Sequence, residues 1–257
     1  MLMRSGNVMI SVISVTYNNL SGLKKTVDSF ISQGVNSCEL IIVDGSSNDG
    51  TRAFLAQIES PNIRFISEED EGIYDAMNKG IKLAKYNFVV FMNAGDIFYN
   101  NNCLNTIKKI VLEDAVYCFD NVCITESGVS KKISSQLNNY FEMPTSHQSI
   151  IFPMIKNLQY DLSYSLASDF DLVNRLRNDS IKFISFPLPL SITEGGGISD
   201  KKWLKCLLEK RDINSRHNGF LLANLNFTVN LIKCLLRAFI RKALSKRMLK
   251  FIKKKFS

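Results

Sequence analysis

Short apolar runs alternate with segments of helical period along the first hundred residues of the chain. Four runs rich in Val, Ile, Leu and Phe predict buried strands, over 9–16, 39–43, 63–66 and 87–92. Between them, the spacing predicts helices over about 19–34, 51–59 and 72–85. Strands that alternate with helices favour a mostly parallel sheet covered by helices, and such sheets bind ligands outside the carboxyl ends of their strands.

The second half of the chain is less regular. It contains three further candidate strands, over 114–124, 147–152 and 181–186, and a candidate helix over 170–177. Three glycines at 195–197 mark a loop, and helices follow from about residue 200. We therefore predict an α/β domain over residues 8–200, followed by a helical extension over residues 201–257.

Composition narrows the class of protein. With 257 residues, 46% hydrophobic and 22% charged, the chain is long enough and apolar enough to bury a sizeable core. It has six cysteines without a C-x-x-C pair and only two histidines. These counts argue against a structural zinc site and a disulfide framework, and they favour a reducing, cytoplasmic setting.

The positive charge of the chain is concentrated at its end. The net charge is +8, and ten of the 32 lysines and arginines, with no acid, lie in residues 230–257. The other 22 basic and 24 acidic residues leave the rest of the chain with a net charge of −2. The charge therefore predicts no nucleic-acid-binding surface on the domain.

Apolar residues recur at helical spacing within this basic tail, among them Ile232, Leu236 and Phe239. A basic amphipathic helix is typical of an element that binds an anionic membrane surface; alternatively, it packs on the domain and turns its charges to solvent. No uncharged apolar stretch reaches the ~20 residues needed to span a bilayer. The N-terminus lacks the pattern of a secretory signal.

Polar motifs follow the predicted strands at the edge where a ligand would bind. Thr16-Tyr17-Asn18-Asn19 follows the first strand, and Asp44-Gly45-Ser46-Ser47-Asn48-Asp49-Gly50 follows the second. Gly72-Ile73-Tyr74-Asp75-Ala76-Met77-Asn78-Lys79-Gly80 begins the third helix, and Asn93-Ala94-Gly95-Asp96 follows the fourth strand. In this order and spacing the motifs resemble those of the family 2 inverting glycosyltransferases, which have the GT-A fold, and above all bacterial polysaccharide and lipopolysaccharide enzymes.

The resemblance implies a nucleotide-sugar donor, with UDP as the expected nucleotide, bound along the strand ends. The donor contacts of the family match seven positions: Thr16, Tyr17, Asn18, Asp44, Asn93, Ala94 and Gly95. Asp44 would accept a hydrogen bond from the base of the donor. From the residues alone, Asp44 is also a suitable Asx-turn residue at the end of a strand, and this alternative stays open.

Asp96 matches the last position of the family's acidic metal motif. The resemblance implies that it holds Mg²⁺ or Mn²⁺ against the diphosphate, where negative charge grows as the sugar departs. The chain carries Asn93 and Gly95 where acids are common in the family. One carboxylate suffices for an ion that keeps water and phosphate ligands. A turn or helix-cap role for Asp96 is the alternative.

Asp75 and Asn78 lie on the polar face of the third predicted helix. They either support the metal loop, contact the donor or form a solvated helix face, and the sequence does not choose among these roles.

An inverting transfer needs a base to take the proton from the attacking hydroxyl. The resemblance places this carboxylate at the start of the helix near residue 170, at a position that matches Asp169. Asp171 is the other candidate, and ordinary helix capping is the structural alternative for Asp169. His147 and Gln148 resemble a His-Gln pair that the family has near the acceptor side, although a lone histidine also fits a structural role.

The resemblance implies transfer, with inversion, to a hydroxyl of a saccharide or lipid-linked saccharide during synthesis of O-antigen, capsule or exopolysaccharide, at the inner face of the plasma membrane. A sugar nucleotidyltransferase would need a Gly-rich N-terminal phosphate loop, which Tyr17-Asn18-Asn19-Leu20 does not provide. The presence of Asp44, Asp96 and Asp169 argues against a non-catalytic scaffold of the same fold.

Overall fold

The computed structural model describes residues 8–111, 113–125, 128 and 130–255, with the backbone alone from residue 241. The chain divides into two compact units, Met1–Lys201 and Lys202–Ser257. Compactness does not show what each unit does, so the catalytic domain over 8–200 and the extension over 201–257 stay predictions.

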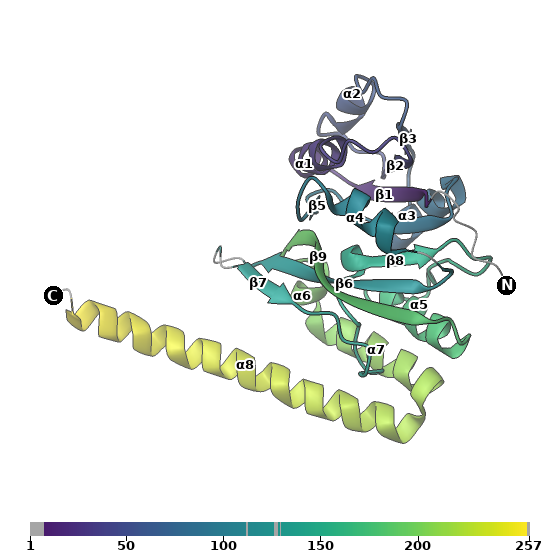
Figure 1. The fold of residues 1–257 in the computed structure, drawn as a ribbon. Coiled ribbons are helices and arrows are strands. Elements are labelled where there is room, and N and C mark those ends of the chain that lie inside the picture. The colour runs from purple at the N-terminus through teal and green to yellow at the C-terminus, as the bar shows by residue number, and fades with distance from the viewer. Residues whose placement is uncertain (1–7, 112, 126–127, 129, 256–257) are drawn as a thin grey trace. The chain divides into compact units, whose positions relative to one another are not determined.

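A single mixed sheet runs through the first unit (Figure 1). Its order is β3 (Ile63–Ser67), β2 (Cys38–Asp44), β1 (Ile10–Thr16), β4 (Phe88–Phe91), β8 (Ile150–Pro153), β6 (Val116–Ile124), β9 (Phe183–Glu194) and β5 (Ile97–Phe98), and β7 (Ser130–Ile133) pairs with β6. The first four strands in this order are parallel. Antiparallel β8 then joins them to the parallel pair of β6 and β9. The predicted α/β fold with a parallel core is confirmed.

Helices cover both faces of the sheet, because the strands of its parallel part are apolar on both sides. On one face the core contains α1 (Leu20–Ile31), α2 (Thr51–Leu55) and α4 (Cys103–Ile110). On the other face it contains α3 (Ile73–Leu83) and α5 (Ser168–Asn178). All six cysteines are free thiols, and three of them are buried.

Several predicted elements have the expected bounds, and some do not. Helix α1 begins close to the predicted start, and the Asn19 side chain caps it by accepting a hydrogen bond from the Gly22 N–H at 3.1 Å. Strand β9 is longer than the run at 181–186, and β5, β7 and α4 were not predicted. At the start of α3, Tyr74 is buried and the neighbouring Ile73 is 44% exposed.

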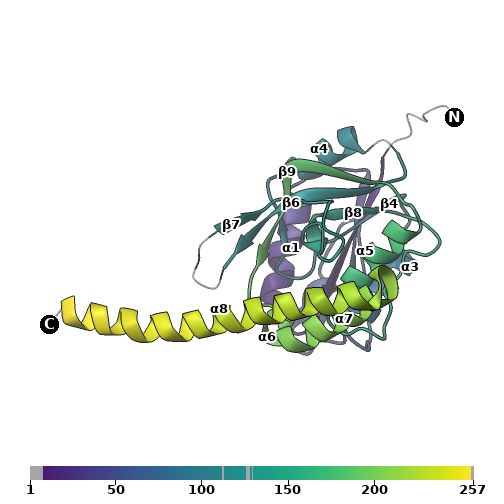
Figure 2. The ribbon, with the colours of Figure 1, turned by 90° about the horizontal axis from the view of Figure 1, so that it is seen from below.

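The second unit is helical. After the short α6 (Ile198–Lys201), it comprises α7 (Trp203–Asn218) and α8 (Phe220–Lys255), joined at Gly219, whose φ of 88° is readily adopted only by glycine. The two helices lie side by side where they meet (Figure 2). The Arg211 guanidinium stands 5.4 Å from the centre of the Phe227 ring.

Helix α8 presents an apolar surface. Judged by length and composition alone, its segment Phe220–Ile240 is apolar enough to cross a membrane, with a mean hydropathy of 1.2. The segment contains Lys233 and Arg237, so it is not one of the uncharged apolar stretches considered as membrane spans in the sequence. The basic residues from 241 to 255 continue the same helix.

Candidate active site

The loops after β1 and β2 are tied to each other at the carboxyl edge of the sheet. The Asn18 N–H donates to the Ser47 hydroxyl at 2.7 Å, and the Asn48 N–H donates to the Asn18 side-chain oxygen at 2.9 Å. Asn18 has a φ of 47°, a left-handed conformation that asparagine tolerates better than most residues. This brings Thr16, whose buried hydroxyl has no partner among the described residues, beside Asp44.

Asp44 is fully buried at the end of β2. Its carboxylate accepts hydrogen bonds from the Ser47 N–H, at 3.2 and 3.3 Å to the two oxygens, and from the Ser67 hydroxyl at 2.6 Å. The turn role that the sequence left open is therefore present. A contact with a donor base remains a prediction, and each carboxylate oxygen keeps acceptor capacity for it.

Gly45 lies where a side chain would not fit. A Cβ atom there would stand 2.4 Å from Asp70 Oδ2 and 3.3 Å from the Tyr17 ring. Asp70 also accepts a hydrogen bond from the Gly72 N–H at 2.9 Å. The Tyr17 ring is 67% exposed, so it faces solvent at this edge with a free surface for stacking.

The turn from Asn93 to Asp96 is held by the first turns of α1. The Asn19 amide donates to the Ala94 carbonyl at 3.0 Å. The Thr26 hydroxyl accepts from the Gly95 N–H at 3.0 Å and lies 2.7 Å from the Asp96 carbonyl oxygen. Thr26 is buried, so the turn rests on a rigid support.

Asp96 is a buried carboxylate, 9% exposed. Burial raises its pKa to about 6, although a hydrogen bond from the Gln148 amide, at 2.9 Å, opposes the increase. Among the described side chains, no lysine or arginine forms an ion pair with it. A hollow of about 210 Å³ opens beside it, lined by Asn19, Ser21, Gly22, Lys25, Ala94, Gly95, Asp96 and Glu194.

Asp169 lies in the first turn of α5, but it does not cap the helix, because the N-cap residue is Ala167. Its Oδ1 accepts hydrogen bonds from the Phe170 N–H at 2.8 Å and from the Tyr74 hydroxyl at 3.3 Å. Burial, and next the negative charge of Asp169, raise the pKa of Tyr74 well above its ordinary value, so the phenol stays protonated and donates. The Asp169 side chain is 22% exposed.

His147 lies beside Asp169 and Asn93. Its Nδ1 is 3.8 Å from Asp169 Oδ2, and its Nε2 is 3.3 Å from the Asn93 amide nitrogen. Burial lowers the pKa of His147, and the Asp169 carboxylate partly offsets this, so the imidazole is neutral at pH 7. The structure thus brings His147, Asn93 and Asp169 together from three distant parts of the sequence.

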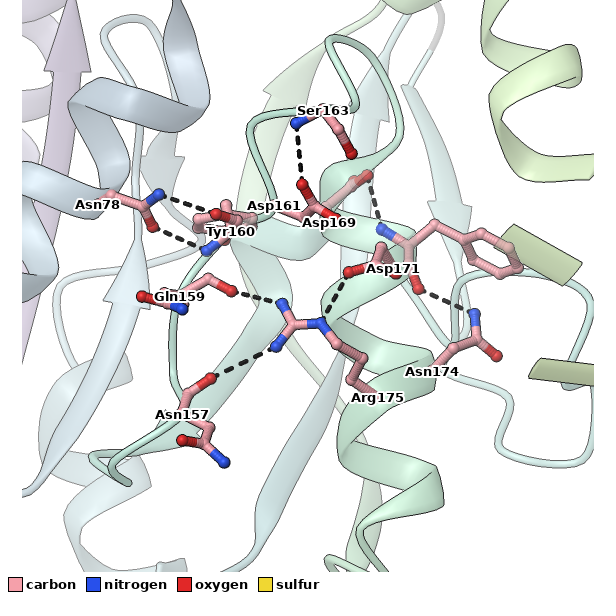
Figure 3. A network of polar contacts seen from close by, with 11 residues as sticks. Asn78, Asn157, Gln159, Tyr160, Asp161, Ser163, Asp169, Asp171, Asn174 and Arg175 are labelled. Carbon is pink, nitrogen blue, oxygen red and sulfur yellow. Dashed lines mark hydrogen bonds and ion pairs between the residues drawn. The ribbon is translucent and has the colours of Figure 1, made fainter. Parts of the chain in front are cut away.

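Asp171, the other candidate base, is engaged elsewhere. Its carboxylate accepts a hydrogen bond from Arg175 Nε at 2.7 Å, and its side chain is only 4% exposed. Arg175 also donates to the carbonyl oxygens of Asn157 and Gln159 (Figure 3). This arrangement favours a structural role for Asp171 and leaves Asp169 as the candidate base.

Asn78 and Asp75 have local partners on α3. The Asn78 amide donates to the Tyr160 carbonyl at 2.9 Å, and its oxygen accepts from the Tyr160 N–H at 2.7 Å (Figure 3). Asp75 forms an ion pair with Lys79 at 3.3 Å and accepts from the Glu71 N–H. Asn78 therefore fastens the segment before α5, rather than the turn at Asp96.

Replacing Asn78 with alanine should lower the free energy of unfolding by about 1–3 kcal/mol, because both backbone groups of Tyr160 lose a partner. Nucleoside diphosphate binding should persist. Denaturant unfolding and calorimetric titration check both parts, and a loss of nucleotide affinity in a fully folded Asn78→Ala protein would show instead that Asn78 contacts the donor.

Tyr74 and Thr26 were not predicted as site residues from the sequence, whereas Gln148 was paired with His147. Gln148 contacts Asp96, Tyr74 contacts Asp169, and Thr26 supports the turn at Gly95. Gln148 had a signal, since it follows His147 in a polar turn before a strand. No pattern in the sequence distinguishes Tyr74 or Thr26 from its helical neighbours.

Comparison with known proteins identifies the family of the chain from the same residues that form this site. The family model described as Glycosyl transferase family 2 matches residues 11–172, which contain all the motifs at the carboxyl edge. The chain belongs to glycosyl transferase family 2. A relative within curated proteins, the PGL/p-HBAD biosynthesis glycosyltransferase of Mycobacterium tuberculosis, is 30% identical over 219 residues, covering 77% of this chain and 84% of the relative.

Solved structures share the fold of this glycosyltransferase. S. aureus TarS 1–349 in complex with UDP-GlcNAc has a TM-score of 0.66 at 14% identity, covering 86% of this chain and 70% of that one. The mannosyltransferase PcManGT of Pyrobaculum calidifontis, in complex with GDP-Man and Mn²⁺, has a TM-score of 0.59 at 14% identity, covering 89% and 65%. At these identities the likeness shows the fold alone.

Proposed function

We propose that this glycosyltransferase moves a sugar from a nucleotide-sugar donor, a UDP-sugar, to an acceptor hydroxyl with inversion at the anomeric carbon. One observation carries the proposal: the buried carboxylate Asp96 and the partly exposed carboxylate Asp169 flank a single dipeptide, His147 and Gln148, which contacts both. Two carboxylates in different environments suit two different roles, one toward the leaving group and one toward the attacking hydroxyl.

On the donor side, the residues fit a divalent cation. Asp96 offers a carboxylate oxygen, the ligand type that Mg²⁺ and Mn²⁺ prefer, and it is buried without a cationic partner among the described side chains. Among these residues, no three His, Cys, Asp or Glu side chains gather in one place, so water and phosphate would complete the coordination. When bound, the ion would offset charge on the departing diphosphate. PcManGT was solved with Mn²⁺ and GDP-Man.

On the acceptor side, Asp169 is the proposed base. Oδ1 is occupied by the Phe170 N–H and the Tyr74 hydroxyl, whereas Oδ2 is free to accept the proton of the attacking hydroxyl. The oxygen then forms the new bond to the anomeric carbon as the bond to the diphosphate breaks. A single displacement of this kind inverts the anomeric configuration.

The acceptor proposed is a saccharide or lipid-linked saccharide used for cell-surface polysaccharides. The curated relative of 30% identity is named for PGL/p-HBAD biosynthesis, and TarS was solved with UDP-GlcNAc. The first name supports a glycosyl transfer in a biosynthetic pathway, and the TarS complex supports a uridine nucleotide as the first donor to test.

The donor is tested first by thermal unfolding with UDP, GDP, CDP and dTDP, each with Mn²⁺ and with EDTA. We expect one nucleotide to raise the unfolding temperature only when Mn²⁺ is present. Release of pyrophosphate from a sugar phosphate and a nucleoside triphosphate would instead identify a nucleotidyltransferase, and a chain that binds no nucleotide under any condition would be a non-catalytic scaffold.

We also propose that α8 binds an anionic membrane surface. Six apolar residues, spaced alternately three and four apart, fall on one face of the helix, and each is 41% to 71% exposed: Leu222, Leu225, Val229, Ile232, Leu236 and Phe239. Lysines and arginines follow along the same helix, with no acid in residues 230–257. Apolar area and positive charge together suit the interface of an anionic bilayer.

The charge pattern distinguishes a bilayer from a second copy of the chain. Parallel pairing of two α8 helices would bring two sets of ten cations together, and antiparallel pairing would lay the charged half of one helix on the apolar half of the other. A membrane span is also disfavoured. Eight cations follow Ile240, and the positive-inside rule would hold them in the cytoplasm and place residues 1–201 outside, away from the nucleotide-sugar pool.

The full chain should therefore sediment with vesicles that contain anionic lipid and bind poorly to neutral ones. Salt should release part of it, because the Debye length falls from ~10 Å at 0.1 M to ~3 Å at 1 M. Replacing Leu225, Ile232 and Leu236 with glutamine should abolish sedimentation and preserve donor hydrolysis. Removing residues 230–257 should do the same.

The matched control replaces two exposed leucines of the first unit, Leu162 and Leu188, with glutamine. This variant should sediment like the wild type. Undiminished sedimentation after removal of residues 230–257 would place the membrane contact elsewhere, and unfolding after that removal would indicate that α8 is a packed structural helix.

A further inference from the structure

Two consecutive side chains on the short turn η1 (His147–Ser149) contact different parts of the candidate active site. Gln148 donates to Asp96 at 2.9 Å, and His147 lies against Asp169 and Asn93. Ser149 turns the other way, into the core. One turn of the chain thus touches both carboxylates of the proposed reaction.

The turn is anchored by buried polar contacts. The Ser149 hydroxyl lies 3.0 Å from the Asp120 carbonyl oxygen and 2.6 Å from the Ser191 hydroxyl. Ser191 donates to the Asn121 side-chain oxygen at 2.9 Å, and the Asn121 amide donates to Thr193 at 2.9 Å. All these residues are buried on β6, β9 and η1, so His147 and Gln148 project from a fixed support.

The contact with Asn93 links the tautomer of His147 to the orientation of the Asn93 amide. As the side chain is oriented, its amide nitrogen lies 3.3 Å from Nε2 and can only donate, which requires an unprotonated Nε2; the opposite orientation would place the amide oxygen there and require a protonated Nε2. With the amide oriented as it is, the proton of the neutral imidazole lies on Nδ1, which faces Asp169 Oδ2 at 3.8 Å. The opposite tautomer would turn a lone pair toward the carboxylate. The separation is longer than a hydrogen bond, which leaves Oδ2 open to an acceptor hydroxyl.

We propose that His147 and Gln148 are positioning residues that hold the two carboxylates in a fixed relation, with the His147 Nδ1–H aiming Asp169 and the Gln148 amide aiming Asp96. The inference rests on the proposed function and goes beyond it by assigning a role to the two residues beside the carboxylates. In this role the imidazole orients Asp169 and transfers no proton itself. The acceptor's proton goes to Asp169, and the dipole of the Nδ1–H holds that carboxylate in one orientation.

Kinetics separate positioning from plain packing. His147→Leu should lower kcat by about 100-fold with little change in the donor KM, because the alignment of a bound acceptor is lost. His147→Asn should recover most of the rate, since its amide nitrogen lies near the position of Nδ1. The control His217→Asn, in α7, should match the wild type. Full kcat in His147→Leu would overturn the proposal.

The deciding measurement needs no turnover. The chain has two histidines, so ¹⁵N-histidine labelling gives two sets of ring signals, and His147→Asn assigns them. We expect His147 in the nucleotide-free protein to show a protonated Nδ1 and an unprotonated Nε2, and Asp169→Asn to move the Nδ1 signal. A protonated Nε2 with an unprotonated Nδ1 would overturn the proposal. Should the wild type consume no donor, the proposed function fails, and the tautomer still decides this inference.

Discussion

Replacing Asp169 with asparagine should lower turnover by about 10²–10⁴-fold, the usual loss when a general base is removed. Asparagine keeps the shape of the side chain, and its oxygen still accepts the hydrogen bond from the Phe170 N–H. The fold, the unfolding temperature and the donor affinity should therefore change little. Steady-state kinetics, together with calorimetric titration of the nucleoside diphosphate, separate this loss of chemistry from a loss of binding.

Asp171→Asn is the matched control, because it removes a carboxylate two residues away on the same helix. Asp171 is buried against Arg175 at 2.7 Å, so Asp171→Asn removes the negative charge that faces the guanidinium, although the asparagine oxygen can still accept from Nε. We expect a fall of about 1–3 kcal/mol in the free energy of unfolding and only a modest change in kcat. A larger loss of turnover in Asp171→Asn than in Asp169→Asn would mean that Asp171 is the base.

Replacing Asp96 with asparagine should abolish metal-dependent nucleotide binding and stabilise the metal-free fold. Burial raises the pKa of Asp96 from an ordinary 3.8 to about 6, so the folded state binds this proton more tightly than the unfolded state. The stability of the metal-free wild type therefore falls as the pH rises from about 4 to about 6, and the loss is complete above that range. At pH 7.5, Asp96→Asn should be more stable by up to about 3 kcal/mol.

Denaturant unfolding between pH 4 and pH 8, with EDTA or with Mn²⁺ and nucleotide, measures both effects. The exposed Asp114 supplies a control variant, Asp114→Asn, which should follow the wild type. Mn²⁺ should stabilise the wild type increasingly as the pH rises through 6, because the proton and the ion compete for one carboxylate. Unchanged metal-dependent nucleotide binding by Asp96→Asn would remove Asp96 from the donor site.

The part of the fold that carries the donor site follows from the sequence with little ambiguity. The β-branched runs that become β1, β2 and β4 are apolar on both faces, and only a sheet covered on both sides accommodates them. Parallel strands end at one edge, so Asp44 and the turn at Asp96 had to lie near each other.

The residues around the proposed general base could not be derived from the sequence in the same way. Asp169 and Asp171 share one helix turn, and only the pairing of Asp171 with Arg175 distinguishes them. Tyr74 meets Asp169 across 95 residues, and Gln148 meets Asp96 across 52. Hydrophobic periodicity shows which face of an element is buried, but it does not show which residue of a distant element packs there.

Helix α8 shows a related limit. The sequence predicted a basic helix with apolar stripes, and the structure leaves six of its apolar residues exposed on one face. The pattern alone cannot tell a face that packs on a domain from one that stays uncovered, because both have the same period.

The most direct test of the account follows the anomeric proton of the sugar by ¹H NMR while wild-type protein consumes a nucleotide-sugar donor. UDP- and GDP-sugars, with Mn²⁺ and high protein concentration, allow water to act as a slow acceptor, so no acceptor need be identified. The account predicts that the sugar first appears as the anomer opposite to that of the donor, before mutarotation, and that Asp169→Asn releases it far more slowly. Initial release of the same anomer, or equal rates in the wild type and Asp169→Asn, would contradict it.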